Sequence, residues 1–222
     1  FRGKLMLQSF IESNYVHICD MQRSILLDEN MKDMASRDEF DSVIVKNWMR
    51  DYGLFQGIKA EHRELIVEVY IENISKIVDG RDPTLLSDLE FMFDELQMLF
   101  YSAVPRKWLS AVSKLLWCSF PNDIVIYDSF VERTLVVLQP LLPELQEHRR
   151  VGVSVSPKTE QDISSITSFY INYSSLVHEI SALHSEQLQA LREKYSEHYP
   201  HDIRIIDKAL WMIGSPNQSY HI

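Results

Sequence analysis

Glycine and cysteine are scarce in this sequence, and long apolar runs are missing. The 222 residues include six glycines and two cysteines. So few glycines leave little room for glycine-rich phosphate loops, for many tight hairpins or for a β-sandwich with a turn about every ten residues. No apolar run approaches the roughly 18 residues that cross a membrane, so we expect no membrane partner.

The two cysteines predict neither a disulfide framework nor a metal site. Cys19 and Cys118 lie far apart, each in a helical pattern beside large apolar residues and without other metal ligands at a useful spacing. Dinucleotide-binding and Walker glycine patterns do not occur, so no cofactor is predicted. Residues 1–14 lack the basic-then-apolar order of a secretory signal, which predicts a cytoplasmic protein.

Negative charge is concentrated in one part of the chain. The formal net charge is −10, and residues 20–100 hold 18 acids against 9 bases. Residues 101–150 hold 6 bases and 5 acids. A polyanion would therefore contact the middle of the chain, because nucleic-acid binders usually present a basic face. The acidic N-terminal half suits a basic partner.

Most of the chain repeats apolar residues at the three- and four-residue spacing of helices. This spacing predicts helices over residues 4–19, 59–79 and 106–119, and one long helix or a helix pair over residues 159–199. Further helix starts are marked by capping boxes or acidic caps, at Ser36 with Glu39, Asp82-Pro83, Ser129 with Glu132, and Asp202. The last helix is expected to end near Gly214.

These elements predict an all-α fold of roughly nine helices. Residues 122–127 are rich in β-branched side chains but too short to found a sheet, so we expect an extended connector there. Residues 149–158 read as a loop. We predict a single all-α domain over residues 1–222, built as two helical lobes with a boundary near residues 149–158.

Residues 104–131 (VPRKWLSAVSKLLWCSFPNDIVIYDSFV) contain the candidate site. On a helix that starts at Arg106, Lys107 and Lys114 project to one side, beside the small residue Ser110, which leaves room for a ligand. The connector that follows delivers Asp128 directly ahead of the next helix.

This arrangement resembles the helix-hairpin-helix DNA glycosylase superfamily, in which a hairpin leads into a helix with a catalytic lysine and an aspartate follows at the start of another helix. It is most similar to the archaeal 8-oxoguanine glycosylase branch, whose lysine has a second lysine at the spacing of Lys107 and Lys114. Residues 113–129 and 204–211 are also similar to uncharacterised bacterial proteins of that general fold. The resemblance implies a helix-hairpin-helix-like element, double-stranded DNA as the partner, Lys107 at the nucleophile position and Asp128 at the position of the catalytic aspartate.

The hairpin departs from the family pattern. The family hairpin is glycine-rich, so that backbone N–H groups can approach a DNA phosphate closely. Residues 102–105 here read Ser-Ala-Val-Pro, with no glycine, and Pro105 has no N–H to donate. The usual surround of the aspartate is likewise replaced, by Tyr127 and Ser129. The resemblance therefore does not imply that this hairpin binds a DNA phosphate.

The implied chemistry needs a lysine and a carboxylate. A neutral lysine amine attacks the sugar carbon that carries the base and forms a Schiff base, after which the strand can be cleaved. Asp128 would stabilise positive charge at the sugar or handle the proton. A nearby cation favours the neutral amine of Lys107, and Lys114 could supply it. The remaining candidate substrate-binding residues are Ser110 and, as stacking walls for a flipped base, Trp108 and Trp117.

Simpler interpretations stand beside these roles. A carboxylate at the position of Asp128 stabilises a helix N-terminus without any catalysis. Lys107 in a first helical turn can be an ordinary solvated lysine. Two hypotheses follow: a DNA glycosylase/AP lyase of the base-excision repair type, or a non-catalytic all-α module whose acidic N-terminal half docks a basic protein partner.

Overall fold

The computed structural model describes residues 2–20, 25–152, 156–195 and 201–215. Within these residues the chain forms ten α-helices and three short 3₁₀ helices, and it has no strand. The all-α prediction is confirmed. The chain divides into two compact units, of which unit 1 contains residues 1–21, 125–153 and 169–222, and unit 2 contains residues 22–124 and 154–168.

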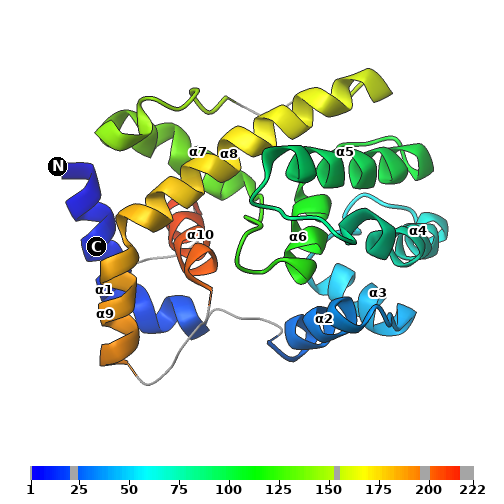
Figure 1. Ribbon diagram of the computed structural model, residues 1–222, viewed down its shortest axis with the longest axis horizontal. Helices are drawn as coiled ribbons and strands as arrows, with labels where there is room; N and C mark the ends of the chain where they lie inside the picture. The colour runs from blue at the N-terminus through cyan, green and yellow to red at the C-terminus, as the bar shows by residue number, and fades with distance from the viewer. Residues whose placement is uncertain (1, 21–24, 153–155, 196–200, 216–222) are drawn as a thin grey trace. The chain divides into compact units, whose positions relative to one another are not determined.

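Unit 2 is built from five consecutive helices. They are α2 (Ile25–Arg37), α3 (Ser42–Asp51), α4 (Ala60–Val78), α5 (Leu86–Ala103) and α6 (Leu109–Ser119) (Figure 1). Each packs on the next, and α6 also packs on α2, so the five contacts close a ring. Its centre is filled by large side chains that are almost fully buried, among them Trp48, Tyr70, Phe93, Phe100 and Trp117. Burial of such residues is the main stabilising term for a helical bundle.

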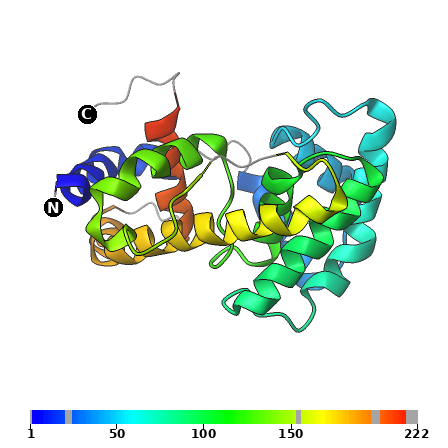
Figure 2. The same cartoon turned by 90° about the horizontal axis from the view of Figure 1, so that it is seen from above.

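Unit 1 combines the first helix of the chain with the last four. They are α1 (Arg2–Asp20), α7 (Ser129–Leu138), α8 (Ile163–Leu183) from residue 169 onward, α9 (Ser185–Lys194) and α10 (Asp202–Gly214). Two 3₁₀ turns, η1 (Gln139–Leu141) and η2 (Pro143–Leu145), follow α7, and a third, η3 (Glu160–Asp162), precedes α8 in unit 2. Helix α10 packs on α7 and on α1, and α9 packs on α1 (Figure 2).

The contact between α7 and α10 depends on a glycine. A Cβ atom added to Gly214 would lie 2.1 Å from the backbone oxygen of Phe130. On the same contact, the Thr134 hydroxyl donates to the carbonyl of Leu210 at 2.8 Å. The absence of a side chain at residue 214 therefore lets the end of α10 lie directly against the first turn of α7.

One helix was not predicted, and one capping box is wrong. Ser36 does not start a helix, because it lies inside α2. The helix that follows begins instead after Asp41, whose carboxylate accepts the N–H groups of Val43 and Ile44 at 2.8 and 3.1 Å. Helix α2 escaped prediction because its sequence, ILLDENMKDMASR, is polar overall and gives only a short apolar repeat.

Other predicted helix starts are displaced by one to four residues. Helix α5 begins at Leu86, because Asp82 instead accepts the N–H and hydroxyl of Thr84 in a turn, at 2.9 and 2.6 Å. Asp202 is the first residue of α10 and does not cap it; the N-cap position is taken by His201, without a side-chain bond. Residues 159–199 contain a helix pair, α8 and α9, followed by residues outside the described part. The end at Gly214 is confirmed.

The connector prediction is confirmed in its main feature. Residues 124–128 have neither helical nor strand structure, and Ile124, Val125, Ile126 and Tyr127 are buried. The chain passes from unit 2 to unit 1 between residues 124 and 125. It passes back between residues 153 and 154, inside the segment 149–158, although residues 153–155 themselves lie outside the described part.

Candidate functional site

The predicted site residues fall in different units. Lys107, Trp108, Ser110, Lys114 and Trp117 belong to unit 2, and Asp128 belongs to unit 1. Each group is described within its own unit.

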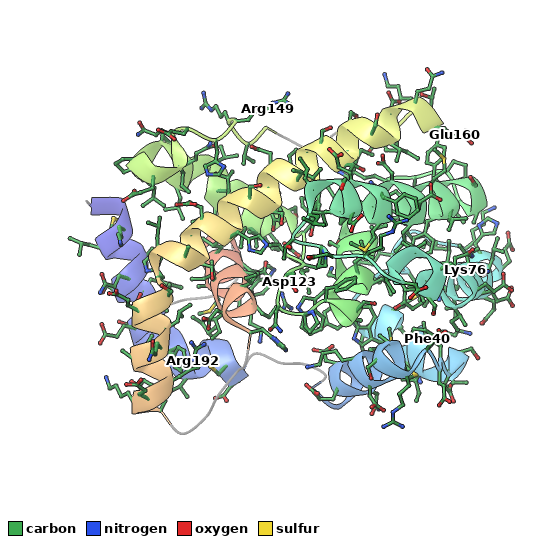
Figure 3. The ribbon with its side chains drawn as sticks, in the orientation of Figure 1. Phe40, Lys76, Asp123, Arg149, Glu160 and Arg192 are labelled. Carbon is green, nitrogen blue, oxygen red and sulfur yellow. The ribbon has the colours of Figure 1, made fainter. Side chains whose placement is uncertain are left out.

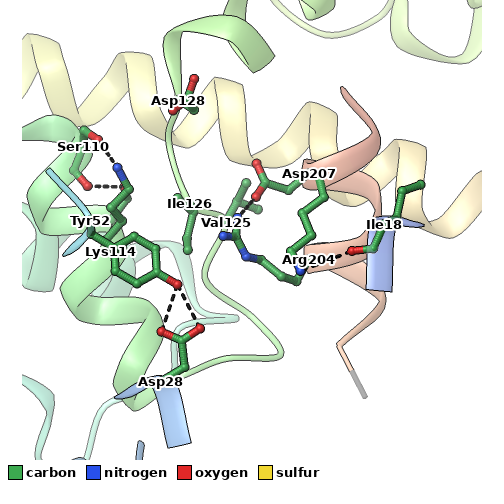
Figure 4. A network of polar contacts seen from close by, with 12 residues as sticks. Ile18, Asp28, Tyr52, Ser110, Lys114, Val125, Ile126, Asp128, Arg204 and Asp207 are labelled. Atoms are coloured by element: carbon green, nitrogen blue, oxygen red, sulfur yellow. Dashed lines mark hydrogen bonds and ion pairs between the residues drawn. The ribbon is translucent and has the colours of Figure 1, made fainter. Parts of the chain in front are cut away.

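Lys114 is a nearly buried lysine on α6. Its side chain is 9% exposed, and its ammonium Nζ donates to the Ser110 hydroxyl at 2.8 Å, one helical turn away. Nζ also lies 6.0 Å from the centre of the Tyr52 ring (Figure 4). The spacing predicted that Lys114 and Ser110 share a face of the helix, and the structure brings them together.

Tyr52 connects this lysine to a buried carboxylate. Its hydroxyl donates to Asp28 of α2, 2.9 Å from each carboxylate oxygen (Figure 4). Trp48 of α3 donates its indole N–H to the same carboxylate at 2.8 Å. We call Asp28, Trp48, Tyr52, Ser110 and Lys114 the unit 2 cluster. Sequence reasoning missed Asp28 and Tyr52 in this role, because they are distant from Lys114 along the chain and only the packing of α2 and α3 brings them together.

Lys107 does not share this helical face. Helix α6 begins at Leu109 with Trp108 at the N-cap position, so Lys107 precedes the helix and the predicted start at residue 106 is wrong. Lys107 is half-buried. The two lysines therefore do not project from one face of one helix, and the role that the resemblance implies for Lys107 remains a prediction.

The segment before α6 is held by packing of its aromatic and basic side chains. The Trp108 indole N–H donates to the carbonyl of Val104 at 2.9 Å, and its ring contacts Phe100 edge-on. Arg106 lies 5.0 Å from the Trp108 ring and donates to the carbonyl of Gln56 at 2.7 Å. These contacts replace the first helical turn that the sequence predicted.

The two candidate stacking tryptophans are interior residues. Trp108 and Trp117 are 2% and 1% exposed. Trp108 packs as described above, and the ammonium of Lys32 lies 5.8 Å from the Trp117 ring. Both indoles are therefore packed within the protein and neither presents a free face on the surface.

In unit 1, Asp128 caps a helix. It occupies the N-cap position of α7, and its carboxylate accepts the N–H of Phe130 at 2.8 Å. The predicted capping box of Ser129 with Glu132 therefore does not form, and Asp128 is the cap. Glu132, which the box would have used to reach the cap backbone, accepts the hydroxyl of Tyr127.

Two tyrosines of α8 hold the connector that leads to Asp128. Tyr170 donates its hydroxyl to the carbonyl of Val125 at 2.8 Å, and Tyr173 donates to the carbonyl of Ile126 at 3.1 Å. The Tyr173 oxygen also accepts the N–H of Asp128 at 3.4 Å. Burial raises the pKa of both phenols well above the usual value, so they stay neutral donors.

A second carboxyl of unit 1 lies inside the protein. Asp207 of α10 is 2% exposed and forms an ion pair with Arg204, one turn earlier. Burial raises the pKa of its carboxyl to about 6; the charge of Asp128 also raises it, whereas Arg204 and Lys208 lower it. The sequence signal for this buried carboxyl was a set of charged residues within a largely apolar helix: Arg204, Asp207 and Lys208. The sequence analysis assigned no role to these residues.

The described residues contain no group of three or more His, Cys, Asp or Glu side chains that could hold a metal ion. In the same part of the chain, no helix has both the length and the apolar character that crossing a membrane requires. No protein-family model, curated protein or solved structure matches this chain.

Proposed function

We propose that this chain is a DNA glycosylase/AP lyase-type protein in which the amine of Lys114 is the nucleophile. The observation that carries the proposal is the environment of that amine: it is nearly buried, on a helix, and hydrogen-bonded to the Ser110 hydroxyl. An amine becomes a nucleophile in its neutral form, and a position fixed by the helix and by Ser110 orients it for attack. Lys107 is half-buried, precedes the helix and is kept as the comparison lysine.

The reaction would proceed at the sugar carbon that carries the base. The amine nitrogen forms a bond to C1′ while the N-glycosidic bond breaks, and the bonding electrons leave with the base, which takes up a proton. The nitrogen supplies that proton; the C1′–O4′ bond then breaks, O4′ takes its bonding electrons and the second proton from nitrogen, and an imine between Lys114 and C1′ remains. Ser110 accepts a hydrogen bond from the amine and orients it. The resemblance implies a proton-handling role for Asp128, which belongs to unit 1.

Borohydride trapping tests this proposal, because borohydride reduces the imine to a stable covalent link. Duplexes with an abasic site or with 8-oxoguanine are incubated with wild type, Lys114→Gln, Lys107→Gln and Asp128→Asn. The expected result is a covalent band that Lys114→Gln abolishes and Lys107→Gln retains. Loss of the band in Lys107→Gln alone would move the nucleophile to Lys107 and contradict the assignment made here.

A matched control separates the loss of the nucleophile from the loss of any lysine. Lys76 lies on the exposed side of α4 in the same unit (Figure 3), and Lys76→Gln should trap as well as wild type. Thermal unfolding of each variant shows whether it is folded. The absence of a band with every duplex, in a folded wild-type protein, would contradict the proposed function.

The alternative function is a non-catalytic module that docks a basic protein partner. Four exposed glutamates favour it, since they follow one another at three- and four-residue spacing along α4: Glu61, Glu64, Glu68 and Glu72. An oligolysine peptide tests this surface by calorimetry. Binding that weakens as salt is raised, and that is lost when the four glutamates are replaced by glutamine, would support docking.

A further inference from the structure

Asp207 has a free carboxylate oxygen in the interior of unit 1. Its Oδ2 is bound by Arg204, whereas Oδ1 is buried and has no hydrogen-bond partner among the described residues. An unpaired buried carboxylate oxygen is costly, because it has lost its hydration without gaining a hydrogen bond. Such a cost, in a helix that is otherwise well packed, indicates a role other than stability.

Asp207 lies beside the connector that ends at Asp128. Figure 4 shows Arg204 and Asp207 on the side of α10 that faces the connector at Val125 and Ile126. The same stretch of connector is held from α8 by the hydroxyls of Tyr170 and Tyr173, and Tyr173 also receives the N–H of Asp128. The charge of Asp128 is one cause of the raised pKa of the buried Asp207 carboxyl. Asp207, its partner Arg204 and Asp128 therefore lie around the same connector (Figure 4).

We propose that Asp207 is a positioning residue for Asp128: held by Arg204 beside the connector, its carboxylate sets the electrostatic environment in which Asp128 works. This inference rests on the proposed function for the role of Asp128. When Asp207 is ionised, it places a second negative charge near Asp128, which favours the approach of a cation. When Asp207 is protonated, that charge is removed.

The groups that set the charge state of Asp207 come from several elements. Helix α10 contributes Arg204 and Lys208, whose ammonium also donates to the carbonyl of Ile18 on α1 at 3.4 Å. Helix α8 contributes the neutral hydroxyls of Tyr170 and Tyr173, and the start of α7 contributes Asp128. Glu132 of α7 is bound to Tyr127. Because Arg204 and Lys208 only partly oppose the effect of burial, Asp207 is expected to titrate near pH 6.

Carbon-13 NMR of the aspartate carboxyls tests the coupling without relying on activity. In wild type, the Asp128 signal should show an inflection near pH 6 that reports ionisation of Asp207. The inflection should vanish in Asp207→Asn. It should persist in Asp202→Asn, the matched control, because Asp202 is also an α10 carboxylate paired with an arginine, Arg192 of α9 (Figure 3). An Asp128 signal that is the same in wild type and Asp207→Asn would overturn the inference.

A second variant covers the case in which Asp207→Asn does not fold. Arg204→Gln removes the cation paired with Asp207, so the inflection in the Asp128 signal should move to higher pH. An inflection that stays in place would overturn the inference. The two arms of the test also separate it from the proposed function. If Asp207→Asn still traps DNA and its pH profile is unchanged, the positioning role alone is overturned. If folded wild type traps no DNA, the proposed function is overturned, and the NMR titration still decides whether Asp207 and Asp128 are coupled.

Discussion

The hydroxyl of Tyr52, at the end of α3, lies 2.9 Å from both carboxylate oxygens of Asp28 on α2 and donates to them. Asp28 is 5% exposed, so the bond is made to a charge that is largely removed from water. Hydrogen bonds to charged groups are about twice as strong as neutral ones. This contact, with the indole N–H of Trp48, fixes α2 against the end of α3 in the unit 2 cluster.

Removing this hydroxyl should destabilise the protein. Tyr52→Phe keeps the ring beside Lys114 but leaves Asp28 with one donor fewer, and the expected loss is about 1.5–3 kcal/mol in the free energy of unfolding. Urea unfolding followed by circular dichroism measures it. Tyr101→Phe, at a half-buried tyrosine of α5, is the control and should change the free energy of unfolding by less than about 0.5 kcal/mol. Equal losses in the two variants would contradict the assigned role of Tyr52.

Gly214 should tolerate no side chain. In Gly214→Ala the new methyl group would meet the backbone oxygen of Phe130 at 2.1 Å and the Thr134 hydroxyl at 2.6 Å, so α10 has to move away from α7. We expect a loss of about 1–3 kcal/mol in the free energy of unfolding, as for other overpacked sites. Gly152→Ala is the control, because nothing lies within 4 Å of its added Cβ. A Gly214→Ala protein as stable as Gly152→Ala would show that the two helices are not in this close contact.

The helices could be predicted largely because their apolar residues repeat clearly. In the segment that forms α4, the apolar spacing predicts one stripe of Leu65, Ile66, Val69, Tyr70, Ile74 and Ile77. The structure buries Ile66, Tyr70, Ile74 and Ile77, whereas Leu65 is exposed and Val69 is half-buried. The segment that became α2 has no comparable stripe, since it contains the polar run DEN and ends in Ser-Arg. Its helical state is stabilised by packing on α3 and α6, which the local sequence does not reveal.

Helix starts were harder to predict, because several residues compete for the cap. Asp128 and Ser129 are both good N-cap residues and adjacent, and the backbone before α7 places the aspartate at the cap. Before α6, the indole N–H of Trp108 donates to the carbonyl of Val104, and Arg106 packs on the Trp108 ring. Residues 106–108, which suit a helix, are therefore held outside it. Tertiary contacts of this kind cannot be inferred from spacing alone.

The candidate site was predictable only where it is local. Ser110 and Lys114 are four residues apart, and helical periodicity alone brings their side chains together. The partnership of Asp28 with Tyr52 joins α2 to the end of α3, and the placement of Asp207 beside the connector joins distant parts of the sequence. Both involve single charged residues in apolar surroundings, a signal that indicates a buried polar group but does not identify its partner.

The thiol of Cys118 should be unreactive in the folded protein. It is 1% exposed, and burial raises its pKa well above the usual value, with the charge of Asp28 adding to the effect and Lys32 opposing it. Because the thiolate is the reactive form, alkylation by iodoacetamide at pH 8 should be about a hundredfold slower in the native protein than in urea. Peptide mapping by mass spectrometry separates Cys118 from Cys19. Rapid, complete alkylation of native Cys118 would show that α6 opens readily.

The buried carboxyl of Asp207 should make stability depend on pH in an unusual direction. Its pKa is raised from 3.8 to about 6 by folding, so between these values the folded protein binds more protons than the unfolded chain. The contribution of this group to stability is therefore greatest below about pH 4 and falls as pH rises to about 6, by at most about 3 kcal/mol. Other carboxylates also make the free energy of unfolding depend on pH, and their contribution cancels when the variant is compared with wild type. The difference in unfolding free energy between Asp207→Asn and wild type, measured by urea unfolding from pH 4 to pH 7, should shift in favour of the variant as pH rises. A difference that is constant with pH, or that shifts toward wild type, would mean that Asp207 is ionised throughout this range and that Arg204 and Lys208 outweigh its burial.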